Sequence, residues 1–148
     1  IDDITRFVDP NTIVTAIETD SSDLNFMPLR ENFERLKSFL NPAGQPFEIY
    51  ELPMPPAVVY EEQRLPASYA NFYIANDVVL VPTFLDRRDE QAKEILQHCF
   101  PTRKIVGIDC TDIVWGLGAF HCLTQQIPQP WTERQRRLPV HVAVQDKG

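Results

Sequence analysis

The sequence predicts an α/β fold built from strand–helix–strand units, and three observations support this prediction. A β-branched segment, an amphipathic segment and an alternating segment follow one another over residues 12–52. The same order of pattern types returns over residues 78–109, at somewhat different spacings. Strands and helices that alternate along a chain are typical of α/β folds. A chain of 148 residues that is 43% hydrophobic is also long enough to bury a core.

The first unit begins with a predicted strand at Thr12–Glu18, which is rich in β-branched residues and lies between Pro10-Asn11 and a polar run. A helix is predicted next, because apolar residues recur at spacings of four, three and four and the pattern stops before Asn41. These residues are Leu29, Phe33, Leu36 and Leu40. Phe47–Leu52 alternates apolar and polar side chains and predicts a second strand, after which prolines favour an irregular segment to about Pro66.

The second unit is predicted to start with two strands, Tyr69–Ala75 and Val78–Phe84. Asn76-Asp77 between them suits the positive backbone angles of a tight hairpin turn. A helix follows Asp86, because Ala92, Ile95, Leu96 and Cys99 share one face. This places Cys99 in the core. The helix stops at Pro101, and Lys104–Asp109 predicts a short apolar strand.

Composition excludes several classes of function. Fourteen basic and twenty-one acidic residues give a formal charge of −7, which repels nucleic acid and is compatible with a cationic substrate, although acidic surfaces also serve solubility alone. No apolar run approaches the roughly 18 residues that span a bilayer, so we expect a soluble protein with no membrane partner. Cys99, Cys110 and Cys122 are an odd number without ligand-like spacing, which favours a reducing, cytoplasmic setting without disulfides or a metal site.

Cys122 is the candidate catalytic residue. Two glycines, Gly116 and Gly118, precede it and permit close approach of a ligand to the main chain, while a polar Thr-Gln-Gln run at 124–126 follows. We expect Cys122 at a loop-to-strand junction, where the thiol can meet a substrate. The alternative is a small buried hydrophobic residue with no chemical role.

Phe120–Pro128 resembles the nucleophile segment of the agmatine deiminase family, within the guanidino-group-modifying superfamily. Pro66–Asn76, Val78–Pro82 and Ile105–Asp109 resemble other strands of that family. The resemblance implies an α/β fold that forms roughly half of a five-bladed α/β propeller, built from strand–helix–strand blades. It implies hydrolysis of a guanidinium to a ureido group and ammonia, with no cofactor. One departure weakens the choice of substrate, since Leu117–Ala119 stands where the commonest family pattern has Gly-Gly-Asn.

The resemblance also implies domain limits and site residues. Residues 1–128 correspond to the C-terminal part of a catalytic domain, and 129–148 form a tail in which alternating valines suit a last strand. Ile1-Asp2-Asp3 resembles the segment after the histidine of the family's His-x-Asp element, which places that proton-carrying histidine before Ile1. Asp2 then binds the guanidinium, since a carboxylate matches its paired N–H groups, and Asp3 is the competitor.

In this interpretation Cys122 is a thiolate of lowered pKa that forms a covalent amidino-thioether, and Gly118 lies against the substrate. His121 is expected to play a structural part, because neighbouring residues of a strand face opposite ways. His98 and His141 are not placed to be catalytic.

Agmatine is the expected small guanidino substrate, giving N-carbamoylputrescine in putrescine and polyamine synthesis. Two alternatives stay open: deimination of peptidyl-arginine, and an inactive α/β module that only binds a partner. The 148-residue chain is expected to be inactive alone and prone to associate, either as a homo-oligomer or with the missing part of the chain.

Overall fold

The computed structural model describes residues 2–127. The predicted tail strand at Val140–Val144 and His141 lie outside the described residues. Within residues 2–127, no helix is long and apolar enough to cross a membrane.

The first unit is a three-stranded sheet with one helix. Strands β1 (Thr5–Phe7) and β2 (Thr12–Ile17) run antiparallel, and β2 pairs in parallel with β3 (Glu48–Pro53). Helix α1 (Phe26–Leu36) connects the two parallel strands. Central strand β2 is buried along most of its length, as its β-branched composition predicts for a strand covered on both faces.

The second unit repeats this topology. Strands β6 (Tyr73–Ile74) and β7 (Val78–Thr83) run antiparallel, β7 pairs in parallel with β8 (Lys104–Asp109), and helix α2 (Arg88–Cys99) connects the parallel pair. The repeated order of patterns in the sequence therefore corresponds to a repeated topology. Residues 2–127 contain two such units.

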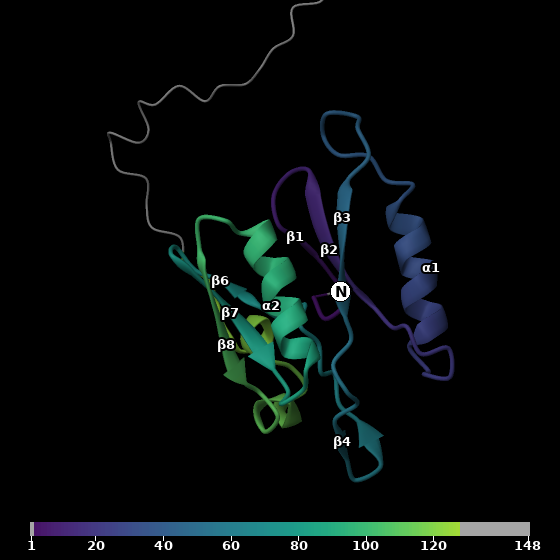
Figure 1. Ribbon diagram of the computed structural model, residues 1–148, viewed down its shortest axis with the longest axis vertical. Coiled ribbons are helices and arrows are strands. Elements are labelled where there is room, and N and C mark those ends of the chain that lie inside the picture. Colours follow the sequence, from purple (N-terminus) through teal and green to yellow (C-terminus); the bar gives the residue numbers. More distant parts are fainter. Residues whose placement is uncertain (1, 128–148) are drawn as a thin grey trace, which may run out of the picture.

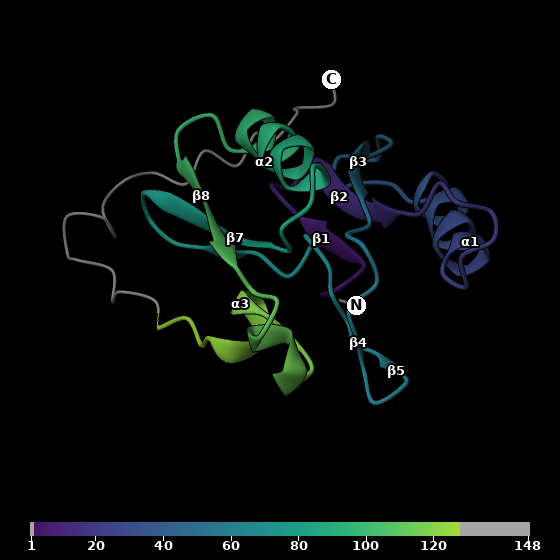
Figure 2. The ribbon, with the colours of Figure 1, turned by 60° about the horizontal axis from the view of Figure 1, so that its bottom comes forward.

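Helix α2 lies between the two sheets, where it contacts β8 of its own unit and β3 of the other (Figures 1 and 2). The main core accordingly mixes both units. Its members from the two sheets and from α2 include Val14, Leu52, Val79, Val81, Ala92 and Leu96. Helix α1 packs on the other side of the first sheet over a much smaller apolar cluster of Ala16, Leu29 and Met54. Cys99 is half-buried against the main core, which confirms its predicted packing role.

The predicted helix over Leu29–Leu40 is too long at its C-terminal end. Helix α1 ends at Leu36, and the tighter turn after it carries bonds from the N–H groups of Ser38 and Phe39 to carbonyls three residues earlier. Leu40 instead forms an isolated bridge with Pro46 and is 61% exposed. Leu40 continues the helical spacing, but no apolar side chain within residues 2–127 covers it.

The hairpin predictions need two corrections. The predicted strand over Tyr69–Ala75 shrinks to Tyr73–Ile74, because the residues before it form a turn in which the Asn71 N–H bonds to the Ser68 carbonyl. The turn at Asn76-Asp77 has no positive φ angles. Such angles occur instead at Glu61 and Glu62, which join β4 (Val59–Tyr60) to β5 (Gln63–Arg64) in the segment expected to be irregular.

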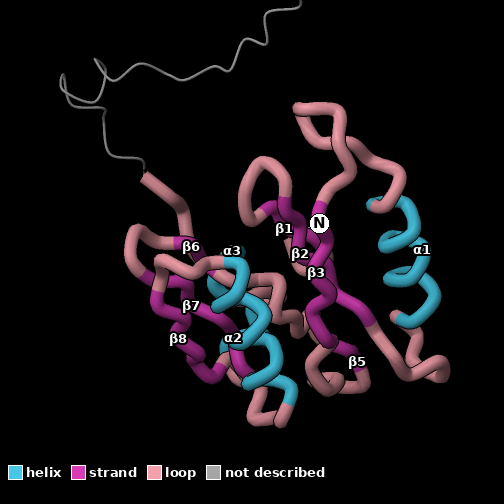
Figure 3. The backbone as a smooth tube through the Cα atoms, turned by 45° about the horizontal axis from the view of Figure 1, so that its top comes forward, coloured by secondary structure: helices cyan, strands magenta, loops and turns pink. Residues whose placement is uncertain are grey.

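The predicted strand at Cys122 is also wrong. After a 3₁₀ turn, η1 (Ile113–Gly116), the chain forms the short helix α3 (Phe120–Leu123), and Cys122 lies on it. Figures 2 and 3 show α3 beside the second sheet. Figure 3 also shows how the loops join the two units. The first N–H groups of a helix lack acceptors within the helix. In α3, the side-chain oxygen of Asn71 accepts from these groups.

Candidate active site

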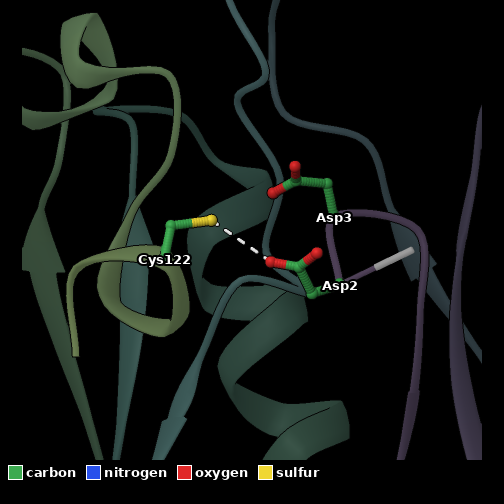
Figure 4. A group of neighbouring side chains, drawn as sticks. All are labelled: Asp2, Asp3 and Cys122. Carbon is green, nitrogen blue, oxygen red and sulfur yellow. Dashed lines mark hydrogen bonds between the residues drawn. The ribbon is translucent and has the colours of Figure 1, made fainter. Parts of the chain in front are cut away.

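The predicted site residues Asp2 and Cys122 lie together with Asp3, the competitor of Asp2 (Figure 4). Both carboxylates come from the segment before β1, whereas the sulfur projects from α3. The thiol of Cys122 donates to Asp2 Oδ2 over 3.2 Å. Residues 120 positions apart therefore meet at one point, where the two units join.

Asn71, just before β6, is the residue that links these groups, and the sequence analysis did not single it out. Its side chain is fully buried. Its Nδ2 donates to Asp3 Oδ1 (2.6 Å), Cys122 Sγ (3.1 Å) and Asp2 Oδ2 (3.3 Å). Its Oδ1 accepts from the backbone N–H groups of Ala119, His121 and Cys122. The sequence does offer one signal for Asn71, which is an asparagine within a run of apolar and aromatic residues. Such a run is expected to be buried, and a buried amide requires hydrogen-bond partners.

The two carboxylates differ in their surroundings. The pKa of Asp2 is lowered, chiefly by the hydrogen bond from Cys122 and further by His121. The pKa of Asp3 is raised because burial disfavours its charged form more than the bond from Asn71 favours it. The backbone carbonyl of Asp3 also accepts a bond of 2.6 Å from the Ser68 hydroxyl. Asp2 is therefore the more exposed and more readily ionised of the two.

The surroundings of the Cys122 sulfur contradict the expected lowered pKa. Partial burial of the thiol raises its pKa most, and Asp2 and Asp3 raise it further, while the hydrogen bond from Asn71 lowers it. The prediction of a lowered pKa is wrong for these surroundings because burial disfavours the charged thiolate and two carboxylates face the sulfur. A bound cation would reverse this balance.

Arg6 and His121 stand next to these groups. Arg6 Nη1 donates to the carbonyls of Ala70 and Phe72, and its guanidinium lies 4.7 Å from the centre of the Phe72 ring. His121 Nε2 lies 4.0 Å from Asp2 Oδ2. Because α3 is a helix, the argument that a strand would turn His121 away from the site is wrong.

Gly118 lies against Cys122. A Cβ atom added at Gly118 would come 2.5 Å from Cys122 Cβ and 2.6 Å from Sγ, closer than real atoms approach. A Cβ at Gly116 would meet nothing within 4 Å. Neither glycine has a positive φ angle, which falls instead at Leu117. Residue 118 must therefore be a glycine, because the Cys122 side chain packs directly against its main chain.

A cavity of about 540 Å³ opens beside Asp2, and neither Asp3 nor Cys122 is among the residues that line it. Asp2, Arg6 and His121 line it together with apolar side chains that include Phe39 and Phe47. A space of this size, apolar with a few converging polar groups, suits a small organic ligand.

The other candidate residues lie apart from this cluster. Burial raises the pKa of both Cys99 and Cys110 to about 11, so neither is a ready nucleophile. His98, on α2, contacts the Tyr50 hydroxyl at 3.0 Å, away from Cys122. The ligand atoms of Asp2, Asp3 and Cys122 lie within 4.8 Å of one another, but each already takes part in a hydrogen bond, and we assign no metal to them.

The chain matches the family model of the Porphyromonas-type peptidyl-arginine deiminase over residues 1–128. A protein of Legionella pneumophila (strain Paris) named "Putative agmatine deiminase" is 39% identical over 132 residues, which are 88% of this chain and 38% of that protein. The crystal structure of the "Putative Arginine Deiminase" from Porphyromonas gingivalis matches with a TM-score of 0.85 and 43% identity, over 87% of this chain and 38% of that one.

The structure of C. jejuni agmatine deiminase matches with a TM-score of 0.74 and 38% identity, over 82% of this chain and 37% of that one. The chain thus spans less than two fifths of the length of each of these proteins.

Proposed function

Because the chain belongs to the Porphyromonas-type peptidyl-arginine deiminase family, we propose that it takes part in the hydrolysis of a guanidino group, with agmatine as the substrate. The observation that carries this proposal is the contact of 3.2 Å between the sulfur of Cys122 and the carboxylate of Asp2. A guanidinium bound to that carboxylate has its central carbon next to the sulfur. The products are N-carbamoylputrescine and ammonia.

The proposed reaction has two halves. The Cys122 thiolate attacks the guanidinium carbon and forms a C–S bond, and the C–N bond then breaks as the departing nitrogen takes a proton from a general acid and leaves as ammonia. Water next attacks the amidino-thioether carbon and returns a proton to the same acid–base group. The C–S bond then breaks, and the electron pair returns to sulfur. The remaining oxygen and nitrogen make the ureido group of the product.

Asp2 is the proposed guanidinium-binding residue, and its environment supports it over Asp3. An ionised carboxylate accepts two parallel N–H bonds from a guanidinium, and the pKa of Asp2 is lowered whereas that of Asp3 is raised. His121 contacts Asp2 rather than the sulfur, so we assign it to holding that carboxylate. Gly118 is proposed to lie against the bound substrate, since its missing side chain lets the main chain come close to the Cys122 sulfur.

The raised pKa of Cys122 is consistent with a cationic substrate. Two carboxylates disfavour the thiolate in the absence of ligand, and a guanidinium placed between them and the sulfur replaces repulsion with attraction. The net charge of −7 also favours approach of a cation and disfavours nucleic acid as a partner.

The decisive test is covalent trapping. A haloacetamidine should alkylate Cys122, because the amidine mimics the guanidinium, and mass spectrometry should find no label on Cys99 or Cys110. Cys122→Ser should remove both the label and ammonia release from agmatine, while Cys99→Ser should keep both. Equal labelling of the three cysteines would contradict the proposal and favour the non-catalytic module.

Peptidyl-arginine is the second candidate substrate, favoured by the description of the matching family model. It is distinguished by assaying ammonia release from agmatine and citrulline formation in an arginine-containing peptide side by side. Turnover of the peptide alone would replace agmatine in this proposal without changing the roles of Cys122 and Asp2.

For the longer assembly, we propose that the two described units are two blades of a five-bladed propeller in a cytoplasmic enzyme. The exposed apolar side chains around α1, which include Leu24, Met27 and Phe39, support contact with further parts of such a ring or with a second copy. Light scattering of the 148-residue chain tests this, and association is the expected result.

A further inference from the structure

We propose that Arg6 is a positioning residue that joins the first unit to the second and thereby sets the distance between Asp2 and Cys122. This inference rests on the proposed function, since it concerns the same site. Asp2 and Cys122 belong to different units, and their side chains meet over 3.2 Å (Figure 4). A hydrogen bond of this length is lost when one unit moves away from the other by about 1 Å. The contact therefore depends on how firmly the two units are held together beside the site.

The Arg6 side chain crosses from one unit to the other. Arg6 lies on β1 of the first unit, and its Nη1 donates to the carbonyls of Ala70 (3.2 Å) and Phe72 (3.0 Å), just before β6 of the second. Its guanidinium also lies 4.7 Å from the centre of the Phe72 ring, within the range in which a cation is attracted to an aromatic face. Two hydrogen bonds and one ring contact thus join β1 to the segment before β6.

The groups that Arg6 contacts are held by the core. Ala70 and Phe72 are fully buried, and a buried carbonyl group needs a donor, which Arg6 supplies to both. The Phe72 ring packs edge-on against Phe100 at 5.8 Å between ring centres, and both rings belong to the main core. Arg6 is therefore attached to a rigid part of the second unit rather than to a surface loop.

The segment that carries Asp2 is fixed on two sides. Before β1, the Ser68 hydroxyl donates to the backbone carbonyl of Asp3 over 2.6 Å. On β1, Arg6 makes its contacts with the second unit. Asp2 precedes both points of attachment, so its carboxylate can keep one place against α3 only while both of them hold.

The charge of Arg6 also suits this position. Burial lowers the pKa of Arg6, and the negative charges of Asp2 and Cys122 act in the opposite direction, but a guanidinium stays charged in either case. Burial raises the pKa of Cys122 most, and Asp2 and Asp3 raise it further. His121 faces Asp2, and it lines the same cavity as Arg6. Removal of Arg6 thus changes both the charge near the thiol and the spacing of the site, and an experiment must separate these two effects.

The experiment measures how strongly Asp2 acts on Cys122 in the presence and absence of Arg6, in the full-length protein. Asp2 raises the pKa of Cys122, so Asp2→Asn should increase the thiolate fraction. Alkylation of Cys122 by iodoacetamide, followed by mass spectrometry across a pH series, should then become about fivefold faster near neutral pH. In an Arg6→Gln background, the same substitution should change the rate by about twofold at most, because side chains that are no longer held in contact interact weakly.

The comparison of the two ratios removes the direct effect of the lost charge, since Arg6 is absent from both proteins of the second pair. An equal effect of Asp2→Asn in the two backgrounds would overturn the inference. So would the absence of any effect in the unaltered background, because Asp2 and Cys122 would then not be in contact.

Arg103→Gln is the matched control. Arg103 is also half-buried, its Nε donates to the carbonyl of Ala75 over 3.0 Å, and its guanidinium lies 5.6 Å from the centre of the Phe100 ring. These contacts stay within the second unit. Asp2→Asn should keep its full effect on Cys122 alkylation in this background, and a loss equal to that with Arg6→Gln would assign the result to general loosening and overturn the inference.

Arg6→Lys covers the case in which Arg6→Gln does not fold. It keeps the charge but replaces the planar guanidinium with a compact ammonium group, which stacks less closely on Phe72. The effect of Asp2→Asn should therefore be reduced to about threefold. A full fivefold effect with lysine would assign the role of Arg6 to its charge alone and overturn the inference.

None of these rates requires turnover, so failure of the inference is distinguishable from failure of the proposed function. Absence of ammonia release from agmatine, together with the expected loss of the Asp2 effect in Arg6→Gln, would refute the proposed function and leave the positioning role supported. Ammonia release with an Asp2 effect that does not depend on Arg6 would support the function and refute the positioning role.

Discussion

The two units share one topology but differ in how much apolar surface they bury. Helix α2 is enclosed between its own sheet and strand β3, and the main core surrounds it. Helix α1 covers one side of the first sheet over a cluster of three residues and leaves large apolar side chains exposed near it. Stability therefore resides mainly at the junction of the units, where buried area is greatest.

The candidate site lies at that same junction. The first unit contributes Asp2 and Asp3 from the segment before its first strand, and the second contributes Asn71 from the segment before its own. Cys122 comes from α3, after the last strand of the second unit, for which the first unit has no described counterpart. The segments before the first strands of the two units thus supply different side chains, carboxylates in one and an amide in the other. Packing of the two units brings these side chains within hydrogen-bond distance.

The largest expected effect tests the division of labour between the two carboxylates. Asp2→Asn keeps the size of the side chain and removes its charge, so kcat/KM for agmatine should fall by about 10²–10³-fold, as for loss of a charged contact at an active site. Asp3→Asn is the matched variant and should be mild, because Asp3 is partly buried and engaged by Asn71. The opposite ranking would exchange the roles of the two residues.

The next prediction compares the two helices through the free energy of unfolding. Leu96→Ala on α2 should cost about 3 kcal/mol, because the lost side chain leaves a cavity enclosed by both sheets. Leu29→Ala on α1 should cost about 2 kcal/mol, because the site is shallow and can collapse. Urea denaturation of the full-length protein measures both. Equal costs would contradict the proposed difference between the units.

Gly118 gives a smaller effect on activity. Gly118→Ala places a methyl group where Cys122 Cβ and Sγ now lie, so the nucleophile must move, and we expect about a tenfold loss of kcat. Gly116→Ala is the control, since its added methyl group meets nothing within 4 Å. Similar losses in both variants would point to a general need for loop flexibility instead.

Sequence patterns predicted the two parallel strands of each unit because each pattern is local, but they did not predict β1 and made β6 too long. Val78–Thr83 is apolar and half of its residues are buried, as expected for a central strand, whereas Lys104–Asp109 is an edge strand with no buried residue. The end of α1 was placed too late because Leu40 continues the helical spacing without an apolar partner. The spacing of apolar residues predicts which face of a helix a residue would occupy. It does not predict whether another part of the chain covers that face.

Local sequence patterns could not predict the structure around Cys122, because contacts with residues far away in the chain determine it. Helix α3 has four residues, too few to be stable by itself, and its free N–H groups are satisfied by Asn71, 51 positions earlier in the chain. The raised pKa of the thiol is also not local in origin, since it comes first from burial and then from Asp2 and Asp3, which reach the sulfur from the other unit. The family resemblance identified the reactive residues, and the structure was needed to show what surrounds them.

The smallest effect concerns the contact between the first unit and the β4–β5 hairpin. Arg64 Nη1 lies 2.7 Å from Asp23 Oδ1 and 2.8 Å from Oδ2, with both side chains mostly but not fully buried. The hydrogen bond from Arg64 lowers the pKa of Asp23, so the contribution is present above the unfolded pKa of aspartate and is lost as pH falls through the lower folded value.

Asp23→Asn should therefore reduce the free energy of unfolding by about 0.5 kcal/mol near neutral pH, the size expected for a partly exposed ion pair. The difference from the unaltered protein should vanish in acid, where Asp23 is protonated in both states, and a series of urea denaturations at falling pH measures it. Glu34→Gln is the control, because the pair between Glu34 and Lys37 lies exposed at the C-terminal end of α1 and joins no two parts of the fold. A loss that persisted unchanged in acid would show that the contact acts through packing rather than charge, and would remove the ion pair from the forces that hold the hairpin against the first unit.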